Sequence, residues 1–153
     1  MFNNENKEIR ISKTLNFPLP LVWEAWTNPE YLVNWWGPKG FTSTIQQMDL
    51  KEGGEWKLVL HGPDGTDYTN RSIFKEVIPL KKIVFEHFNP HFITTVVFES
   101  LNDKTVMDWR MLFDSEEMRN IVVTAHKAED GQKENVEKLE HYLREKIKEI
   151  EDL

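Results

Sequence analysis

The side chains of this 153-residue chain that could do acid–base or metal chemistry are its histidines, and their spacing matches no familiar site. His87 and His91 lie on either side of Asn89–Pro90, so they do not share one face of a helix. His126 stands three residues before Glu129, which is a helical spacing. A zinc site needs three or four converging ligands with a second shell. Because no H-E-x-x-H or Cys–His pattern is present, we expect no metal.

The motifs of common enzymes are also missing. The sequence has no G-x-S-x-G turn, no G-x-G-x-x-G loop and no P-loop. Cysteine is absent, which excludes thiol catalysis and iron–sulfur clusters. We therefore expect no catalytic residue and no cofactor. An enzyme that uses scattered residues of a cavity stays open as an alternative, with His87, Tyr68 and His126 as candidates.

Tryptophan is concentrated in residues 18–37. The four indoles there are Trp23, Trp26, Trp35 and Trp36. Each has a large apolar body and one N–H donor that needs a partner when buried. One interpretation is that Trp23 and Trp26 seal the end of a core. The other is that Trp35, Trp36 and Phe41 form a mobile lid at the mouth of a cavity, beside a Gly-Pro-Lys-Gly loop.

The composition restricts partners and location. The net charge is −7, a field that repels phosphate backbones and anionic lipid, so we expect no nucleic-acid and no membrane partner. No apolar run is long enough to span a bilayer, and the first residues do not resemble a secretory signal. We expect a cytoplasmic protein with one domain over 1–153.

The hydrophobic patterns predict mostly strands, followed by a long helix. Short helices are expected over 21–26 and 29–36, and a long amphipathic helix from 114 to the C-terminus. Strands are expected over 7–17, 44–50, 55–61, 66–77, 82–88, 92–100 and 105–113. Gly131 falls within the long helix, where glycine costs about 1 kcal/mol relative to alanine. We therefore expect a break, a kink or a close backbone approach there.

This order of elements indicates an α+β fold. Consecutive strands joined by short turns form antiparallel sheets, and one long amphipathic helix must cover a face of such a sheet. A strongly curved sheet wrapped around that helix, with the short helices at one end, leaves a cavity between the two layers.

Several sequence segments strengthen this interpretation. They are Pro20–Glu30, Trp35–Pro38, Gly53–Trp56, Gly62–Gly65, Val77–Pro79, Lys82–Phe85 and Leu139–Leu143. With them the chain resembles, over nearly its whole length, the START-like (helix-grip) superfamily and, within it, homologues of the heat-shock-protein-90 ATPase activator. The resemblance implies a carrier or binder of small molecules. Such proteins often have tryptophan after the glycine of the last helix. Here Gln132 follows Gly131, so the size and polarity of the cavity depend on this glutamine.

We expect the non-enzymatic binding or transport of a small hydrophobic molecule, aromatic or lipid-like, in a stress-related setting. The expected ligand-binding residues are Trp35, Trp36, Phe41, Trp56, Leu58, Tyr68, Phe85, His87, Trp109, Met111, Met118, Val122 and His126. If the interior is filled, these residues form an ordinary core. A second alternative is an accessory protein that docks on a chaperone, or on a second copy as a homodimer, through exposed Trp35 and Trp36.

Overall fold

The computed structural model describes residues 5–152, apart from the side chains of Glu5 and His126. The expected role of His126 therefore lies outside the described residues. The helices are α1 (Leu19–Thr27), α2 (Pro29–Leu32), α3 (Glu116–His126) and α4 (Ala128–Glu151), with a 3₁₀ turn, η1, over Glu5–Lys7. The strands are β1 (Glu8–Leu15), β2 (Thr42–Met48), β3 (Glu55–His61), β4 (Asp67–Ile78), β5 (Lys82–Phe88), β6 (Phe92–Leu101) and β7 (Lys104–Phe113).

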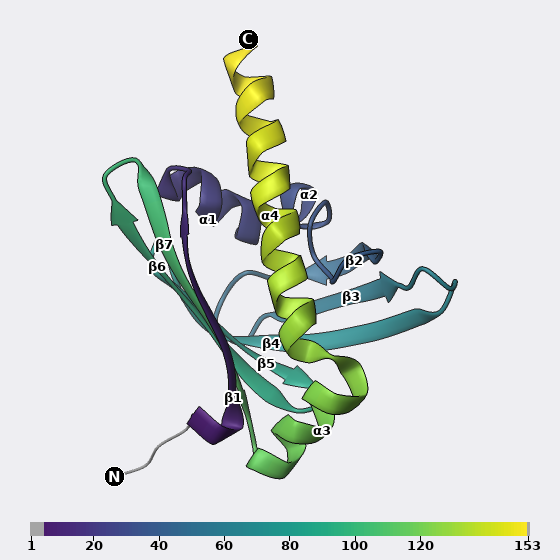
Figure 1. Ribbon diagram of the computed structural model, residues 1–153. Helices are drawn as coiled ribbons and strands as arrows, with labels where there is room; N and C mark the ends of the chain where they lie inside the picture. The colour runs from purple at the N-terminus through teal and green to yellow at the C-terminus, as the bar shows by residue number, and fades with distance from the viewer. Residues whose placement is uncertain (1–4, 153) are drawn as a thin grey trace.

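The strands form one antiparallel sheet of seven, in the order β1-β7-β6-β5-β4-β3-β2. The first strand therefore pairs with the last, and every other pair is a hairpin neighbour in sequence. Irregular register between Ile45 and Gln47, and between Phe74 and Glu76, bends the sheet, since a bulge increases local twist. The sheet curves around α4, as Figure 1 shows. The predicted α+β helix-grip fold is confirmed.

The second short helix is shorter than predicted. Asn28 caps it through its side-chain oxygen, which accepts a hydrogen bond from the Glu30 N–H at 3.0 Å. Regular helix ends at Leu32 and turns follow, whereas the sequence predicted helix as far as Trp36. In the turns that follow, the Trp35 indole reaches α1, where its Nε1 donates to the Ala25 carbonyl at 3.0 Å.

The long C-terminal helix is divided in two, but not at Gly131. The break is at Lys127, whose φ of 50° is left-handed and stops the helical ladder. Arg119 of α3 joins the two helices by donating to Glu129, and it also donates to the Glu8 carbonyl of β1. Gly131 lies inside α4, where an added Cβ atom would lie 3.6 Å from the Pro38 side chain, which is an ordinary van der Waals contact. The break, kink or close backbone approach expected at Gly131 is therefore not found there.

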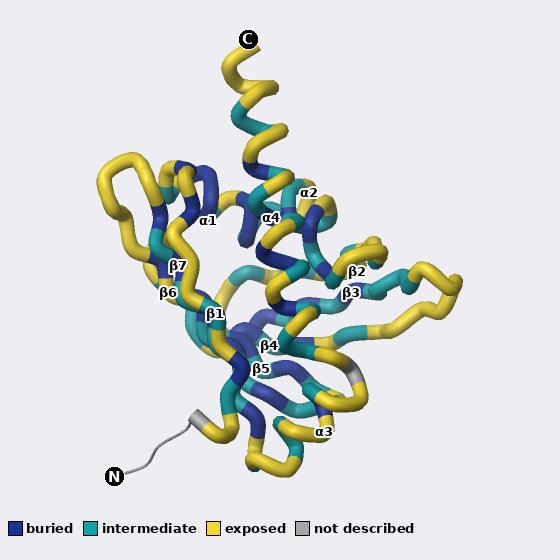
Figure 2. Tube along the Cα trace, viewed as in Figure 1, coloured by how far each residue is buried: buried dark blue, intermediate teal, exposed yellow. Residues whose placement is uncertain are grey.

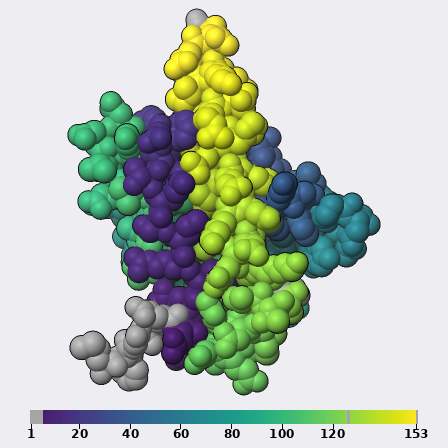
Figure 3. Space-filling view, in the orientation of Figure 1, coloured from purple at the N-terminus to yellow at the C-terminus, as the bar shows by residue number. Residues whose placement is uncertain are grey.

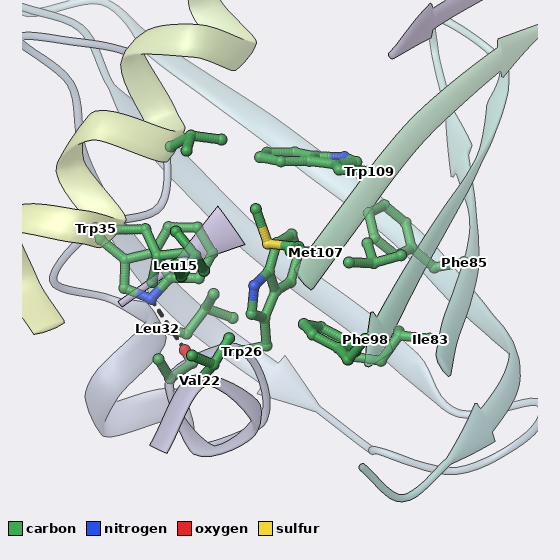
Figure 4. Close-up of a cluster of buried hydrophobic side chains, with 14 of the residues drawn as sticks. Leu15, Val22, Trp26, Leu32, Trp35, Ile83, Phe85, Phe98, Met107 and Trp109 are labelled. Carbon is green, nitrogen blue, oxygen red and sulfur yellow. Dashed lines mark hydrogen bonds between the residues drawn. The ribbon is translucent and has the colours of Figure 1, made fainter. Parts of the chain in front are cut away.

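Tryptophans fill the core at one end of the sheet (Figure 4). Trp26 is 2 % exposed and makes edge-to-face contacts with Trp35 and Trp109, at centroid distances of 4.9 and 5.0 Å. Trp23 packs against Phe98 at 5.6 Å. Such contacts add about 0.5–1.5 kcal/mol beyond area burial. The interpretation of Trp23 and Trp26 as core residues fits this packing.

Helix α4 covers the concave side of the sheet and then leaves the body of the protein. In the space-filling view it lies between β1 and the segment that contains α2 and β2 (Figure 3). Val136, Leu139 and Leu143 on this helix are buried, whereas its last turns are mostly exposed (Figure 2). The burial of three residues at helical spacing fixes which face of α4 meets the sheet.

We predict that Leu139→Ala lowers the free energy of unfolding by about 2–5 kcal/mol, because it removes a completely buried side chain and leaves a void. Leu101→Ala is the control, since Leu101 is half exposed on a hairpin. Urea denaturation of both variants measures the difference. Equal losses would show that α4 does not pack on the sheet as described.

Candidate functional site

A cavity of about 200 Å³ lies between the sheet and α4. Its lower wall comes from five strands, through Trp56, Leu58, Leu60, Asn70, Ser72, Phe85, His87, Phe92, Thr94, Trp109 and Met111. The turns after α2 contribute Trp36, Gly37 and Pro38, and α4 contributes Ala128, Gly131, Gln132 and Asn135. The predicted hollow between the two layers is therefore present in the structure.

The register of the sheet explains why these residues meet. Trp56 lies opposite Ser72, Ser72 opposite His87, and His87 opposite Phe92, which makes one row across β3 to β6. Side chains directly opposite in antiparallel strands stand about 4.5–5.5 Å apart on one face. A parallel row runs from Phe85 through Thr94 to Met111. Alternate residues of each strand thus reach the same concave surface.

Seven of the thirteen predicted ligand-binding residues line this cavity. They are Trp36, Trp56, Leu58, Phe85, His87, Trp109 and Met111. Of the remaining residues, Trp35 is completely buried in the core and Tyr68 is 47 % exposed, with its ring 6.0 Å from that of Phe41. Whether any of these residues contacts a ligand stays a prediction.

Met118 and Val122 were expected to form the upper wall, but they lie on α3 and do not line the cavity. The sequence predicted one long helical region whose irregular point would be Gly131. Because the chain breaks at Lys127, α4 rather than α3 supplies the helical residues that line the cavity. Two polar residues of α4 line it. Gln132 was expected to affect the cavity, whereas Asn135 was not predicted, although it stands four residues after Gly131, on the same helical face.

The cavity wall contains buried polar atoms that have no partner among the described residues. They are the Thr94 hydroxyl and the indole N–H groups of Trp56 and Trp109. Each such buried group costs about 1–3 kcal/mol in lost solvation. Gln132 is satisfied on one side, since its Nε2 donates to the Trp109 carbonyl at 3.1 Å.

His87 stands in the wall between two oxygen atoms. Its Nδ1 lies 2.8 Å from the Pro90 carbonyl, and its Nε2 lies 2.8 Å from Oδ1 of Asn70. An imidazolium donates to both oxygens, whereas a neutral ring requires the Asn70 amide to present its NH₂ group instead. Burial lowers the pKa of His87 and so favours the neutral ring; the Pro90 carbonyl opposes this effect.

The turn beside the cavity mouth is held to α4 by side chains. Asn135 donates to the Trp35 carbonyl at 2.6 Å and accepts from the Gly37 N–H at 3.2 Å. The Lys138 ammonium donates to the carbonyls of Gly37 at 3.1 Å and Phe41 at 2.9 Å. The predicted mobile lid is therefore a turn whose backbone is tied at several points, because α4 supplies the donors and acceptors that its amides lack.

We predict that Asn135→Ala lowers the free energy of unfolding by about 2 kcal/mol or more, because it leaves a buried carbonyl and a buried N–H without partners. Amide hydrogen exchange at Gly37 should accelerate by more than the global loss of stability explains. Glu137→Ala, at an exposed position of the same helix, is the control. If exchange at Gly37 is unchanged, the hydrogen bonds of Asn135 do not hold this turn.

His91 forms a polar bridge between two carboxylates. Its Nε2 lies 2.7 Å from Glu86, and its Nδ1 lies 2.9 Å from Asp114, just before α3. The Glu86 carboxylate, followed by Asp114, raises the pKa of His91, because both stabilise the imidazolium. The bridge thus connects β5 to the start of α3.

A group whose folded-state pKa is raised stabilises the fold below its unfolded pKa, near 6.5, and loses this effect as pH rises through the folded pKa. We therefore predict that the stability lost in His91→Gln is larger at about pH 6 than at about pH 9. Urea denaturation at both pH values tests this. A loss that grows with pH would show the opposite linkage.

The fold and the cavity define the class of the protein as a helix-grip α+β domain. A family model described as activator of Hsp90 ATPase homolog 1-like protein matches residues 16–145. The chain belongs to this family. No curated protein matches the chain. No helix of the described residues is both long and apolar enough to cross a bilayer.

Solved structures share the fold over almost the whole chain. A protein from Arthrobacter aurescens is 24% identical, covers 95% of this chain and 90% of its own, and has a TM-score of 0.86. A protein from Nitrosomonas europaea is 21% identical, covers 94% and 98%, and has a TM-score of 0.83. The AHSA1 protein from Silicibacter pomeroyi is 17% identical, covers 91% and 99%, and has a TM-score of 0.73.

Proposed function

We propose that this protein binds a small hydrophobic molecule in the cavity between the sheet and α4, without catalysing a reaction. The observation that carries the proposal is the cavity itself, about 200 Å³ in volume and walled by aromatic side chains. Ligand sites are typically concave and apolar, with a few polar groups that fix orientation. Such groups are supplied on the sheet by Ser72, His87 and Thr94.

The volume sets the size of the guest. An engineered cavity of about 150 Å³ in another protein admits benzene. A cavity of about 200 Å³ therefore suits a molecule of one or two rings, rather than a long acyl chain. Each ~100 Å² of apolar surface buried contributes about 2.5 kcal/mol before the costs of association. Micromolar affinity needs about 8 kcal/mol net, so shape and polar contacts must add to burial.

We predict that Gly131→Phe abolishes the binding of small aromatic probes, because the new ring enters the cavity from α4. Lys133→Phe places the same ring at an exposed position of the same helix and should leave binding intact. A panel of one- and two-ring aromatics, followed by thermal shift and tryptophan fluorescence, measures both variants.

If no member of the panel changes the melting temperature or fluorescence of the unmodified protein, the proposal is wrong. If Gly131→Phe still binds as the unmodified protein does, the probes occupy another place. Retention of the far-ultraviolet circular dichroism spectrum in both variants separates blocked binding from loss of the fold.

Docking on a chaperone through exposed tryptophans receives no support from the packing. Trp35 has no exposed surface, and Trp36 packs between Trp56 and Trp109 at centroid distances of 5.1 and 5.6 Å. The aromatic patch that motivated this alternative is thus largely turned inward.

A further inference from the structure

The lining of the cavity lacks fixed charge. Among its described lining residues there is no Lys, Arg, Asp or Glu, and the only side chain that titrates near neutral pH is His87. This absence is unusual for a site that must hold an anion, because a buried charge without a counterion is strongly destabilised. The wall instead carries uncharged amides and hydroxyls.

Two cations close to lining residues are already engaged elsewhere. The Lys138 ammonium behind the turn donates to the carbonyls of Gly37, Pro38 and Phe41, at 3.1, 3.4 and 2.9 Å. Arg71 stands between two cavity residues in sequence, but it pairs with Glu55 at 3.1 Å. Neighbouring residues of a strand face opposite sides of the sheet, so Arg71 lies on the other face from the cavity.

The polar atoms without a partner indicate which hydrogen-bonding group a bound molecule needs. Thr94 is 1 % exposed, and its hydroxyl is without a partner among the described residues. The indole N–H groups of Trp56 and Trp109, which also lack partners, can only donate. Both indoles make edge contacts with other rings, Trp56 with Phe85 and Trp109 with Trp26, and such contacts satisfy an N–H only weakly. All three atoms have almost no accessible surface in the structure. The Thr94 hydroxyl can turn toward a guest by rotation about χ1, whereas the two indoles are held by their ring contacts. A hydrogen-bond acceptor on the guest would therefore complete this wall at Thr94.

We infer that the cavity selects uncharged aromatic molecules of one or two rings that carry a hydrogen-bond acceptor, such as an amide or ketone oxygen, and rejects carboxylates of the same shape. This inference rests on the proposed binding function and narrows it. The cavity would therefore bind aromatic amides and ketones in preference to fatty acids and other anionic lipids. The Thr94 hydroxyl is the group that donates a hydrogen bond to this acceptor.

The test uses three probes that share the naphthalene ring system: 2-naphthamide, 2-naphthoate and naphthalene itself. Titrations at about pH 8 keep the naphthoate ionised and the His87 imidazole neutral. Calorimetry gives the affinities, and the indole N–H signals of the nitrogen-15 NMR spectrum report contact with the wall. We expect 2-naphthamide to bind about tenfold or more tightly than 2-naphthoate, and about fivefold more tightly than naphthalene.

Thr94→Val should remove the advantage of the amide over naphthalene, because valine has the same shape without the hydroxyl. Thr95→Val is the matched control, since the next residue of β6 faces the other side of the sheet. A further variant, Asn70→Lys, places a cation at the cavity and should shift the preference toward 2-naphthoate by about tenfold.

Equal affinity for 2-naphthamide and 2-naphthoate in the unmodified protein would overturn this inference and leave the proposed function standing. An amide advantage that survives Thr94→Val would overturn the role of Thr94. If the three probes all fail to bind, the proposed function itself is wrong.

Discussion

The attachment of α4 to the turn after α2 through Asn135 is the constraint on which the cavity depends. One side chain accepts from the Gly37 N–H and donates to the Trp35 carbonyl, both buried. These bonds set the height of α4 above the sheet at one end of the cavity. Gly131 lies one helical turn away, where an added Cβ atom would make an ordinary contact with the Pro38 side chain. The same contacts place Gln132 over β7, where it donates to the Trp109 carbonyl.

The sheet supplies the opposite wall through its curvature and its register. Large side chains close one end of the concave face, where Trp26, Trp35 and Trp109 pack together. Toward the middle, smaller residues such as Ser72 and Thr94 leave room that no side chain fills. The hollow therefore results from an alternation of large and small residues along a bent surface. The atoms that line this hollow include uncharged polar groups as well as apolar ones.

Much of the fold could be predicted from the sequence, because strand and turn signals depend on local patterns. The strands at 55–61 and 82–88 have the predicted limits, and the turn at Gly53–Gly54 forms where glycine is required. A Cβ atom at Gly54 would lie 1.9 Å from the Asp49 carbonyl oxygen. The period of two along each strand also placed Trp56, Phe85 and Trp109 on the concave face.

The upper wall of the cavity could not be predicted in the same way. Its residues depend on where the helical region breaks, and Lys127 adopts a left-handed conformation that its residue type does not signal. Because the irregular point was expected at Gly131 and not at Lys127, Met118 and Val122 were assigned to the wall and Asn135 was missed. The attachment of the turn at 37–40 was missed for a related reason. Glycine and proline at 37–40 indicated mobility, but the ties from α4 come from residues about one hundred positions away.

Whether a guest occupies the cavity between the sheet and α4 is tested most directly by NMR, through contacts between the guest and the methionine methyl groups. Met111 lines the cavity, whereas Met107 is buried in the core and Met118 lies on α3. With carbon-13-labelled methionine methyls and 2-naphthamide, we expect nuclear Overhauser effects from the ring protons to Met111 and none to Met107 or Met118. Effects confined to Met118, or none at all in a complex that binds, would contradict this expectation.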